Sequence, residues 1–438
     1  MTQLDLLRQR RFSALFTTQF LGAFNDNVYK NALIIFITFE AARDAAARAM
    51  LVTVSAGVFI LPFVLFSAWA GQIADKLEKS ALIRAIKLAE IAIMVLAAIA
   101  FALGSTIMLI ALLFLMGTQS AFFGPLKYGI LPQLLEKTEL VAGNGLIQMA
   151  TFVAILVGMI LGGKVAAIPE AGPLVVGGTI IALALLGWLS SLGVPRAGAA
   201  EPSLSVDRGP WPSMFTGMAY ARETPGVFAA ILGVSWFWFL GATFLQLLPA
   251  YGRDTLNGNP DVIIMLLTCF TIGIGLGALI CARLSGKKIN LRLVPVGAVG
   301  MTVFGLGPLL FLDSPSDTID SLQGITEVLA YPGNRVAIAS FIGLAVSGGV
   351  FIVPLYTYVQ ANSALSRRAR VIAANNIINS LLMVVSALLT LGALGVGMSI
   401  PQIFAAVAVL NLFYTLIVIG ALARFESRHT RAESPSRT

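Results

Sequence analysis

Long apolar runs separated by short polar segments occupy almost the whole chain of 438 residues. A helix needs about 20 apolar residues to cross a bilayer, and most of these runs are that long. Short alternating segments, which a membrane barrel would need, do not appear. Lipid offers no partner to backbone polar groups, so such runs are expected to be helical. We therefore predict an all-α membrane protein with twelve transmembrane helices, over residues 12–38, 51–73, 81–103, 106–129, 140–163, 172–193, 226–249, 262–284, 291–312, 336–359, 370–395 and 400–423.

The predicted helices form two sets of six that repeat one another. The longest polar link, "VPRAGAAEPSLSVDRGPWPSM", begins at Val194 and is rich in proline, serine and glycine, as linkers are. "FLGA", "PLKYGILPQ" and "VAGNGLIQ" in the first half are followed, in the same order, by "FLGA", "PLYTYVQ" and "IAANNIIN" in the second. Parallel six-helix repeats are typical of the major facilitator fold. We predict an N-terminal half over 1–194, a cytoplasmic linker over 195–225, a C-terminal half over 226–424 and a cytoplasmic tail over 425–438.

Composition narrows the class of protein further. Charged residues make up only 11% of the chain against about 25% in soluble domains, and the mean hydropathy is +0.89. The two cysteines, Cys269 and Cys281, lie in or beside one apolar run, and the one histidine, His429, lies in the polar tail. This usage argues against a disulfide scaffold, a metal cluster and histidine chemistry inside the membrane. The first apolar run is too long for a signal peptide, so we expect a retained helix.

Basic residues predict the orientation of the chain in the membrane. Most of the 29 lysine and arginine residues fall on one side of the predicted helices, the side that also holds both termini. The other side carries acids, among them Asp313, Asp317, Asp320 and Glu327. Because cytoplasmic loops are the basic ones, both termini are expected to be cytoplasmic. The net charge of +8 is then a topology signal, and no nucleic-acid partner is expected.

A charged loop on the basic side, "GQIADKLEKS", resembles the loop motif of the major facilitator superfamily. Gly71, Asp75, Lys76 and Lys79 match that motif, and Glu78 stands where a glycine is usual. We expect a conformational latch in which Asp75 lies near a helix N-terminus, where negative charge is favourable. The alternative is a solvated charged turn.

The stretch "FLGAFNDNVYKN" concentrates polar residues inside the first apolar run: Asn25, Asp26, Asn27, Lys30 and Asn31. Asp26 lies about 21 Å along its predicted helix, beyond the middle of the membrane. A charge at such depth costs about 2.5–3.5 kcal/mol, so it is expected to face a bundle interior or a wet cavity and to bind substrate or cation. Asp26 and Lys30 are spaced i, i+4 and could instead form a structural ion pair. Lys30 could also extend to the interface.

Further polar residues inside the apolar runs are candidates for the same site. Lys127 follows Gly124 and Pro125 and is either a cation for an anionic headgroup or an interfacial lysine. Lys87 and Glu90 are interpreted as a helix-surface pair. Aromatic residues at 236–239, with Gln246 nearby, could form an apolar wall opposite the polar one or could be ordinary packing. Five amides are either inter-helix hydrogen-bonding groups or cavity lining: Asn144, Gln148, Asn375, Asn376 and Asn379.

Three stretches carry a more specific resemblance. "FLGAFNDNVYKNAL", "FFGPLKYGILPQLL" and "VAGNGLIQMATFVAILVGMILGG" resemble the bacterial lysophospholipid transporter family (LplT type), close to its branch fused to an acyltransferase. The resemblance implies an inner-membrane porter that moves lysophosphatidylethanolamine to the cytoplasmic leaflet for re-acylation, with a coupling sodium ion. It also implies that Asp26 engages cation or amine headgroup and Lys127 the phosphate. Family members can carry a basic residue where the nearest polar residue here is Gln246.

The acyltransferase itself is not expected in this chain. The fused enzyme carries a histidine followed five residues later by aspartate, whereas Ser434 lies five residues after His429. We therefore predict a transporter that is no enzyme, with membrane lipids and a separate acyltransferase as partners.

Other functions stay open at this stage. A proton-coupled facilitator could export drugs or small organic ions through Asp26, because the fold does not determine the substrate. A membrane acyltransferase is argued against by the missing motif. A non-transporting anchor for an acyltransferase would have no need of Asp26 within the membrane.

Overall fold

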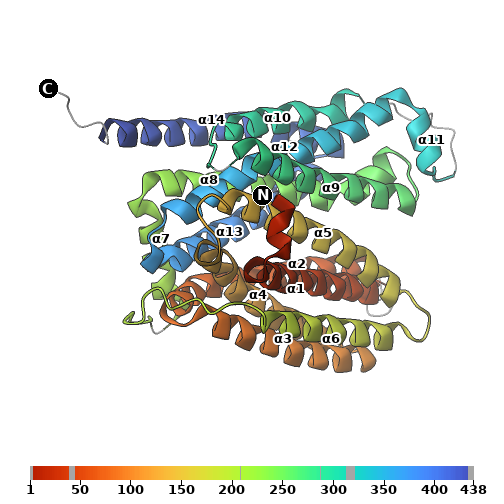
Figure 1. Ribbon diagram of the computed structural model, residues 1–438. Coiled ribbons are helices and arrows are strands. Elements are labelled where there is room, and N and C mark those ends of the chain that lie inside the picture. The colour runs from red at the N-terminus through yellow and green to blue at the C-terminus, as the bar shows by residue number, and fades with distance from the viewer. Residues whose placement is uncertain (1–2, 39–44, 208, 287, 312–320, 433–438) are drawn as a thin grey trace. The chain divides into compact units, whose positions relative to one another are not determined.

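A computed structural model describes residues 3–38, 45–207, 209–286, 288–311 and 321–432 (Figure 1). The described residues contain no β-strand beyond one isolated bridge between Gly258 and Gln323. Twelve long helices follow one another: α1 (Arg10–Phe36), α2 (Ala45–Lys76), α3 (Lys79–Ala102), α4 (Thr106–Leu134), α5 (Leu140–Ala166), α6 (Gly172–Ser191), α8 (Pro225–Ala250), α9 (Pro260–Ser285), α10 (Leu293–Leu310), α12 (Pro332–Asn362), α13 (Arg368–Gly395) and α14 (Ile400–Ala432). Short elements are η1 (Gln3–Arg8), α7 (Pro210–Glu223), η3 (Tyr251–Thr255), α11 (Ile325–Ala330) and η4 (Leu365–Arg367).

Each predicted membrane helix has a counterpart among these twelve. Within the described residues, eleven are long and apolar enough to cross a membrane. The remaining one, α1, has 27 residues, and its charged and amide side chains interrupt its apolar run. The all-helical membrane fold predicted from the apolar runs is therefore confirmed.

Some helices extend beyond the ends predicted for them. α4 continues beyond residue 129 to Leu134 and contains Pro125 and Pro132 within its length. α14 continues to Ala432, so the first part of the predicted tail is helical. The predicted linker contains α7, which begins at Pro210, a residue well suited to a first helical turn. Asp313, Asp317 and Asp320, used for the orientation, lie outside the described residues.

The chain divides into two compact units. The first comprises Met1–Tyr220 and Ser363–Ser380, and the second comprises Ala221–Asn362 and Leu381–Thr438. The grouping follows packing rather than chain order, since the linker through Tyr220 and the first part of α13 pack with the N-terminal helices. The predicted repeat of two six-helix halves remains a prediction.

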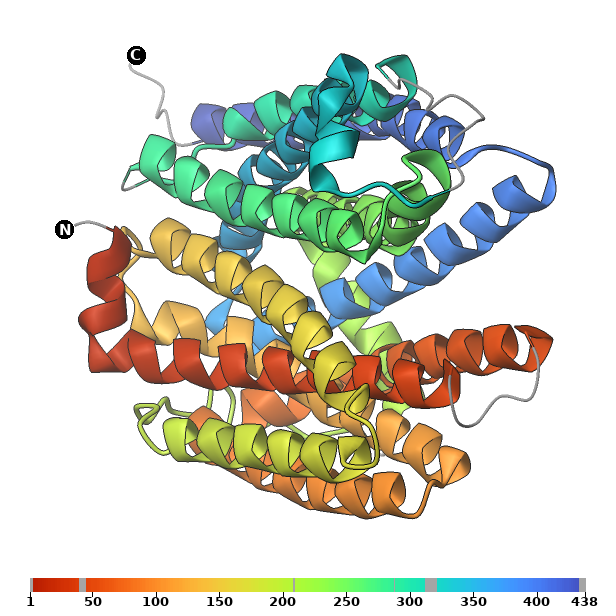
Figure 2. The same ribbon diagram turned by 90° about the vertical axis from the view of Figure 1, so that its right-hand side faces the viewer.

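In the first unit, α1 lies between α5 and α6, and α3 packs against α6 and α4. Figures 1 and 2 show α3 and α6 side by side, and Figure 2 shows α5 running along α1. Small residues permit this approach: a Cβ at Gly162 of α5 would lie 2.9 Å from the Cα of Val28 on α1. The neighbouring core contains Tyr29, whose hydroxyl donates to the carbonyl of Leu109, and Phe101. α1 is thus held on two sides, which fixes the direction of its polar side chains.

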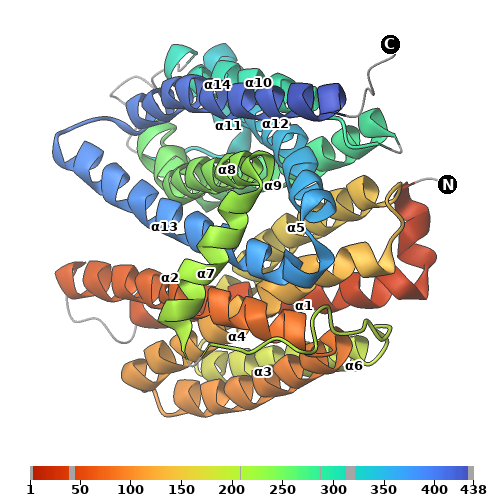
Figure 3. The same ribbon diagram turned by 90° about the vertical axis from the view of Figure 1, so that its left-hand side faces the viewer.

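The α7 helix crosses α2 at a steep angle (Figure 3). Gly217 of α7 lies where a Cβ would contact Ala68 of α2 and the carbonyl oxygen of Arg370 on α13. In the second unit, α12 packs against α8, α9 and α10, while α14 packs against α8 and α10. Gly349 of α12 faces α9 so closely that a Cβ would lie 2.6 Å from the nitrogen of Ala278.

Candidate functional site

The polar stretch of α1 divides into side chains that bond their own helix and side chains that face other helices. The amide of Asn27 donates to the carbonyl of Ala23 at 2.7 Å, and that of Asn31 donates to the carbonyl of Asn27 at 3.1 Å. Asn25 and Asn27 are buried, and Asn31 is half-buried. Of the three amides, Asn25 is the one that reaches another helix, at Glu90 of α3.

Asp26 is tied to α4 rather than to Lys30. The hydroxyl of Ser120 donates to Asp26 Oδ2 at 2.7 Å, while Asp26 Oδ1 is buried and has no hydrogen-bond partner among the described residues. Lys30 places its ammonium 4.3 Å from the centre of the Phe59 ring, a cation–π contact. The ion pairs found among the described residues do not include Asp26 with Lys30. The ion pair that their i, i+4 spacing offered is therefore not formed in this structure, and one carboxylate oxygen is left available.

Lys87 and Glu90 form a buried ion pair, so their interpretation as a helix-surface pair was wrong. Lys87 Nζ lies 2.6 Å from Glu90 Oε2, and both side chains are 1% exposed. The α3 face that carries them points into the bundle against α1, α4 and α6. Gly22 of α1 leaves the space that the Lys87 ammonium occupies, and Gly187 of α6 lies beside its chain. An ion pair this deep in apolar helices is a feature of the site rather than of the surface.

Hydrogen bonds connect this ion pair to Asp26 through α4. Glu90 accepts from the amide of Asn25 at 3.1 Å and from the amide of Gln119 at 2.9 Å. Ser120, next to Gln119, lies within hydrogen-bond distance of both Gln119 Oε1 and Asp26 Oδ2. We call these six residues the α1–α3–α4 network: Asn25, Asp26, Lys87, Glu90, Gln119 and Ser120. Asn25 and Asp26 of this network were predicted from the sequence, whereas Lys87, Glu90, Gln119 and Ser120 were missed as site residues.

Lys127 lies in the C-terminal part of α4, beyond Gln119 and Ser120. Its ammonium is 4.6 Å from the centre of the adjacent Tyr128 ring, and it is attracted electrostatically by Asp26. The Tyr128 hydroxyl donates to Gln148 Oε1 at 3.2 Å, while Gln148 Nε2 is buried and has no partner in the described part of the chain. Asn144, one turn before Gln148 on α5, donates to the carbonyl of Leu140 at 3.0 Å. Gln148 thus bridges α4 and α5, as expected of an inter-helix amide, and keeps one polar atom unused.

The amides of α13 belong to the first unit as well. Asn375 is 1% exposed, and neither of its amide atoms has a partner within the described residues. Asn376 lies against Gly124 of α4, which has no side chain to displace it. Asn379 is buried.

Gln246 lies on α8 in the second unit, and its side chain is exposed. The aromatic residues expected to form an apolar wall there are mostly packed inside that unit. Trp236 stacks on Phe239 and on Tyr414, with ring centres 4.7 and 4.3 Å apart. Its indole nitrogen donates to Asn411 at 2.8 Å. These contacts favour the interpretation as ordinary packing for Trp236 and Phe239.

The loop motif places Asp75 at the start of α13. Asp75 accepts from the backbone nitrogens of Ala369 at 3.2 Å and Arg370 at 3.3 Å, and pairs with Arg370 Nε at 3.0 Å. Gly71 permits the approach, since a Cβ there would lie 2.9 Å from the Ala369 carbonyl oxygen. Lys79 is 1% exposed with its ammonium free of hydrogen bonds to described residues.

Lys76, another residue of the motif, is half-buried. The position of Asp75 at the N-terminus of α13 is the geometry expected of a latch.

The predicted linker is bound to this loop. Glu78 accepts from the backbone nitrogen of Ala197 at 2.9 Å and also from the first turn of α3 at Ser80 and Ala81. Glu201 pairs with Arg370 at 3.0 Å, so one guanidinium joins the loop, the linker and α13. Glu78, which departs from the usual glycine, therefore caps α3 and holds the linker at the same time.

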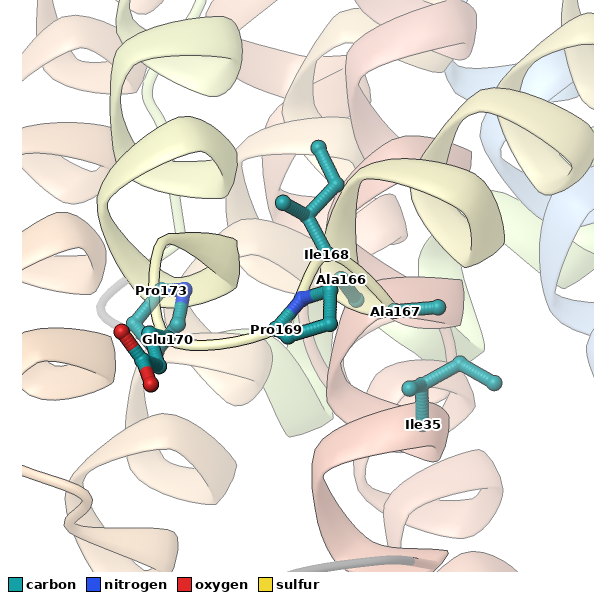
Figure 4. Close-up of a pocket in the computed structure, with 7 residues that line it drawn as sticks. All are labelled: Ile35, Ala166, Ala167, Ile168, Pro169, Glu170 and Pro173. Carbon is teal, nitrogen blue, oxygen red and sulfur yellow. The ribbon is translucent and has the colours of Figure 1, made fainter.

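A pocket of about 470 Å³ lies at the far end of α1 from η1. It is lined by Ile35 and by residues between α5 and α6, and Glu170 is the one ionisable group among its lining residues (Figure 4). Figure 4 shows the Glu170 carboxylate on the side of the loop away from Ile35. Six of its seven lining residues have apolar side chains, and none of them belongs to the α1–α3–α4 network.

Comparisons with known proteins agree with this architecture. The family model of the Major Facilitator Superfamily matches residues 15–387. Among curated proteins, the chain is 28% identical to the lysophospholipid transporter LplT of Escherichia coli O9:H4 (strain HS) over 439 residues, covering 97% of this chain and 98% of that one. It is 27% identical to the lysophospholipid transporter LplT of Serratia proteamaculans (strain 568), covering 81% of both.

Solved structures show the same fold at low identity. The human organic anion transporter MFSD10 (TETRAN) has a TM-score of 0.73 and 13% identity, with 93% of this chain and 99% of that chain covered. The transporter FucP in the outward conformation has a TM-score of 0.68, also at 13% identity, with 97% and 99% covered.

Proposed function

The chain belongs to the major facilitator superfamily, and on that premise we propose that it is a secondary transporter of lysophospholipids. Its substrates are lysophosphatidylethanolamine and related lipids, which it moves to the cytoplasmic leaflet of the bacterial inner membrane by alternating access. The names of relatives matched over most of their length support this substrate class. The clustering of basic residues on one side supports an orientation with both termini cytoplasmic.

One observation carries the proposal: a carboxylate in the middle of α1 has an oxygen without a partner. Asp26 Oδ1 is buried and accepts no hydrogen bond from the described residues, and the nearby Lys30 and Lys87 interact with the carboxylate only through their charge. A charge within the membrane is costly. The compensation we propose is a ligand cation, either a coupling sodium ion or the ammonium of an ethanolamine headgroup. A role as mere anchor would not require an available carboxylate there.

Lys127 is the proposed partner of the phosphate. It provides a positive charge on α4, in the electrostatic field of Asp26, and no carboxylate pairs with it within the described residues. An ammonium is a compact charge that binds phosphate well. Asp26 and Lys127 together match the two charges of a zwitterionic headgroup, while the acyl chain remains in an apolar environment.

The proposed transport cycle uses the alternating access that is typical of the superfamily, in which the two halves of the chain move against each other. A cation at Asp26 offsets the buried charge and permits the halves to rock, and the headgroup passes toward Lys127. The Asp75–Arg370 contact at the start of α13 is proposed as the latch that must open in this cycle. Re-acylation of the delivered lipid then falls to a separate acyltransferase.

The test is movement of labelled lysophosphatidylethanolamine into proteoliposomes with and without an inward sodium gradient. We expect sodium-stimulated movement that Asp26→Asn abolishes, whereas Asp254→Asn, at an exposed acid of η3, leaves it intact. Absence of lipid movement in folded wild-type protein would overturn the proposal. Proton gradients and small organic ions would then be tested, as the drug-exporter alternative requires.

A further inference from the structure

Glu90 has no role in the proposed transport cycle, yet its carboxylate accepts hydrogen bonds from three different helices. Its carboxylate accepts from Lys87 at 2.6 Å, from Gln119 at 2.9 Å and from Asn25 at 3.1 Å. These donors come from α3, α4 and α1. The side chain is fully buried, so the bonds are not shared with water.

The hydrogen bonds to Glu90 determine the orientation of two amide side chains, those of Asn25 and Gln119. An amide side chain offers one oxygen acceptor and one nitrogen donor group. Because Asn25 and Gln119 both give their nitrogens to Glu90, their oxygens are directed elsewhere. Gln119 Oε1 lies near the hydroxyl of Ser120, and Asn25 Oδ1 is buried without a partner.

Asp26 follows Asn25 directly and has its own unpaired buried oxygen. Two consecutive residues of α1 therefore each keep a buried oxygen that no described group satisfies. The Ser120 hydroxyl, bonded to Asp26 Oδ2, adds a third oxygen beside this carboxylate. Carboxylate, carbonyl and hydroxyl oxygens are the ligands that a hard metal cation prefers, and Lys30 and Lys87 lie in the electrostatic field of the same carboxylate.

Lys87 makes this arrangement compatible with a cation site. It neutralises Glu90, so Glu90 can orient the amides without adding a second net negative charge. The space for its ammonium is provided by Gly22, three residues before Asn25. The Lys87–Glu90 pair thus packs against the part of α1 that carries the two unpaired oxygens.

We propose that Glu90, neutralised by Lys87, is a positioning residue that holds the Asn25 amide with its oxygen available beside Asp26 and so makes this part of α1 selective for sodium. The inference rests on the proposed function, since it assumes a cation at Asp26. It goes further by assigning Asn25 Oδ1 as a ligand and Glu90 as the group that sets its orientation.

The experiment measures sodium binding to the purified full chain in detergent. ²²Na⁺ binding and the shift of the unfolding temperature with sodium chloride are recorded, with potassium chloride holding ionic strength constant. Asn25→Leu removes the oxygen, keeps the size of the side chain and leaves the Lys87–Glu90 pair intact. Lys87→Met/Glu90→Gln removes the orienting charge without leaving an unpaired lysine.

We expect both variants to bind sodium at least about tenfold more weakly than wild type, a loss of about 1.4 kcal/mol. The matched control is Arg11→Met/Glu139→Gln, which removes another ion pair of the first unit, between α1 and the start of α5, and should bind sodium as wild type does. A purely structural role of Glu90 would lower the unfolding temperature without changing the sodium concentration at half-saturation.

The outcomes separate the inference from the proposed function. Loss of sodium binding in Asp26→Asn together with wild-type binding in Asn25→Leu would overturn the inference and leave the cation at Asp26 in place. Should the double variant fail to fold, Asn25→Leu alone decides. If wild-type protein moves lysolipid but shows no sodium binding, the inference is wrong while lysolipid transport stands.

Discussion

Asp75 and Arg370 lie 295 positions apart in the chain and form a buried ion pair, with Asp75 Oδ2 3.0 Å from Arg370 Nε. The side chains are 0% and 3% exposed, so water screens neither charge. The same carboxylate accepts two backbone N–H groups from the first turn of α13, which a helix N-terminus leaves unpaired. One acid therefore satisfies an arginine and a helix end together.

We expect Asp75→Asn to destabilise the protein, because it leaves the Arg370 guanidinium buried with one carboxylate fewer. Loss of one partner of a buried ion pair costs about 3–5 kcal/mol in soluble proteins. The measurement is thermal unfolding of purified protein in detergent. Lys76→Gln, a change at a half-buried motif residue, is the control and should unfold close to wild type. Equal unfolding temperatures for Asp75→Asn and wild type would contradict this account of the latch.

Glu78 gives the linker contact a dependence on pH. Partial burial alone would raise the pKa of Glu78, but hydrogen bonds from the backbone of Ala197, Ser80 and Ala81 lower it below its usual value. A lowered pKa in the folded state means that the unfolded chain binds more protons at acid pH. The stabilisation is therefore present above the ordinary glutamate pKa of about 4.3 and is lost as pH falls through the lower folded value.

We expect Glu78→Gly, which restores the usual motif residue, to remove both the cap of α3 and the bond to Ala197. The variant should unfold at lower temperature than wild type at pH 7. The difference should shrink as pH falls below about 4.3, where Glu78 of the unfolded chain takes up a proton, and should vanish below the lower pKa of the folded protein. Limited proteolysis of the linker at pH 7 provides a second readout. Glu136→Gln, at an exposed acid beyond α4, should change neither. A pH-independent difference would argue against the carboxylate as the cause.

Most of the fold could be predicted from the sequence, because the signals for membrane helices are local. Each apolar run contains its own signal of length and hydropathy, and residues such as Pro225 and Pro260 mark helix starts. α7 was missed because 14 residues in a Pro- and Ser-rich link carry no such signal. Gly217 of α7 lies close to α2 and α13, which are distant from it in sequence.

The site was only partly predictable for the same reason. Asp26 stands out in a long apolar run, so its burial cost alone marks it. Lys87 and Glu90 have i, i+3 spacing, which is compatible with either the surface or the core. The packing of α1 and α4 on α3 shows that they belong to the core. The rule applied to Asp26, that charges deep in a membrane helix are functional by default, would have identified Glu90 too.

Lys127 should affect lipid recognition rather than folding, because its ammonium makes no ion pair with a described carboxylate. We expect Lys127→Met to raise the KM for lysophosphatidylethanolamine about tenfold, equivalent to about 1.4 kcal/mol, and Lys127→Arg to recover part of the loss. Initial rates in proteoliposomes measure this. Lys137→Met, at an exposed lysine soon after α4, is the matched control. An unchanged KM in Lys127→Met would exclude Lys127 as the phosphate partner.

The position of Asp26 depends on how closely α5 approaches α1, and two adjacent glycines allow a direct test. A Cβ at Gly162 would lie 2.9 Å from the Cα of Val28 and closer still to its carbonyl oxygen, so the two backbones must separate to admit it. A Cβ at Gly163 would meet no atom within 4 Å. We expect Gly162→Ala to destabilise the protein by about 1–3 kcal/mol through overpacking. Gly163→Ala should be neutral or stabilising, because alanine is the better helix former.

Thermal unfolding and lysolipid transport, measured on both alanine variants, separate packing from function. Gly162→Ala is expected to lose transport in greater proportion than stability, since it displaces the α1 segment that carries Asp26 two residues before Val28. Gly163→Ala is expected to transport as wild type does. Wild-type stability and transport in Gly162→Ala would mean that α1 and α5 are not in contact at this point, and that another contact holds Asp26 in place.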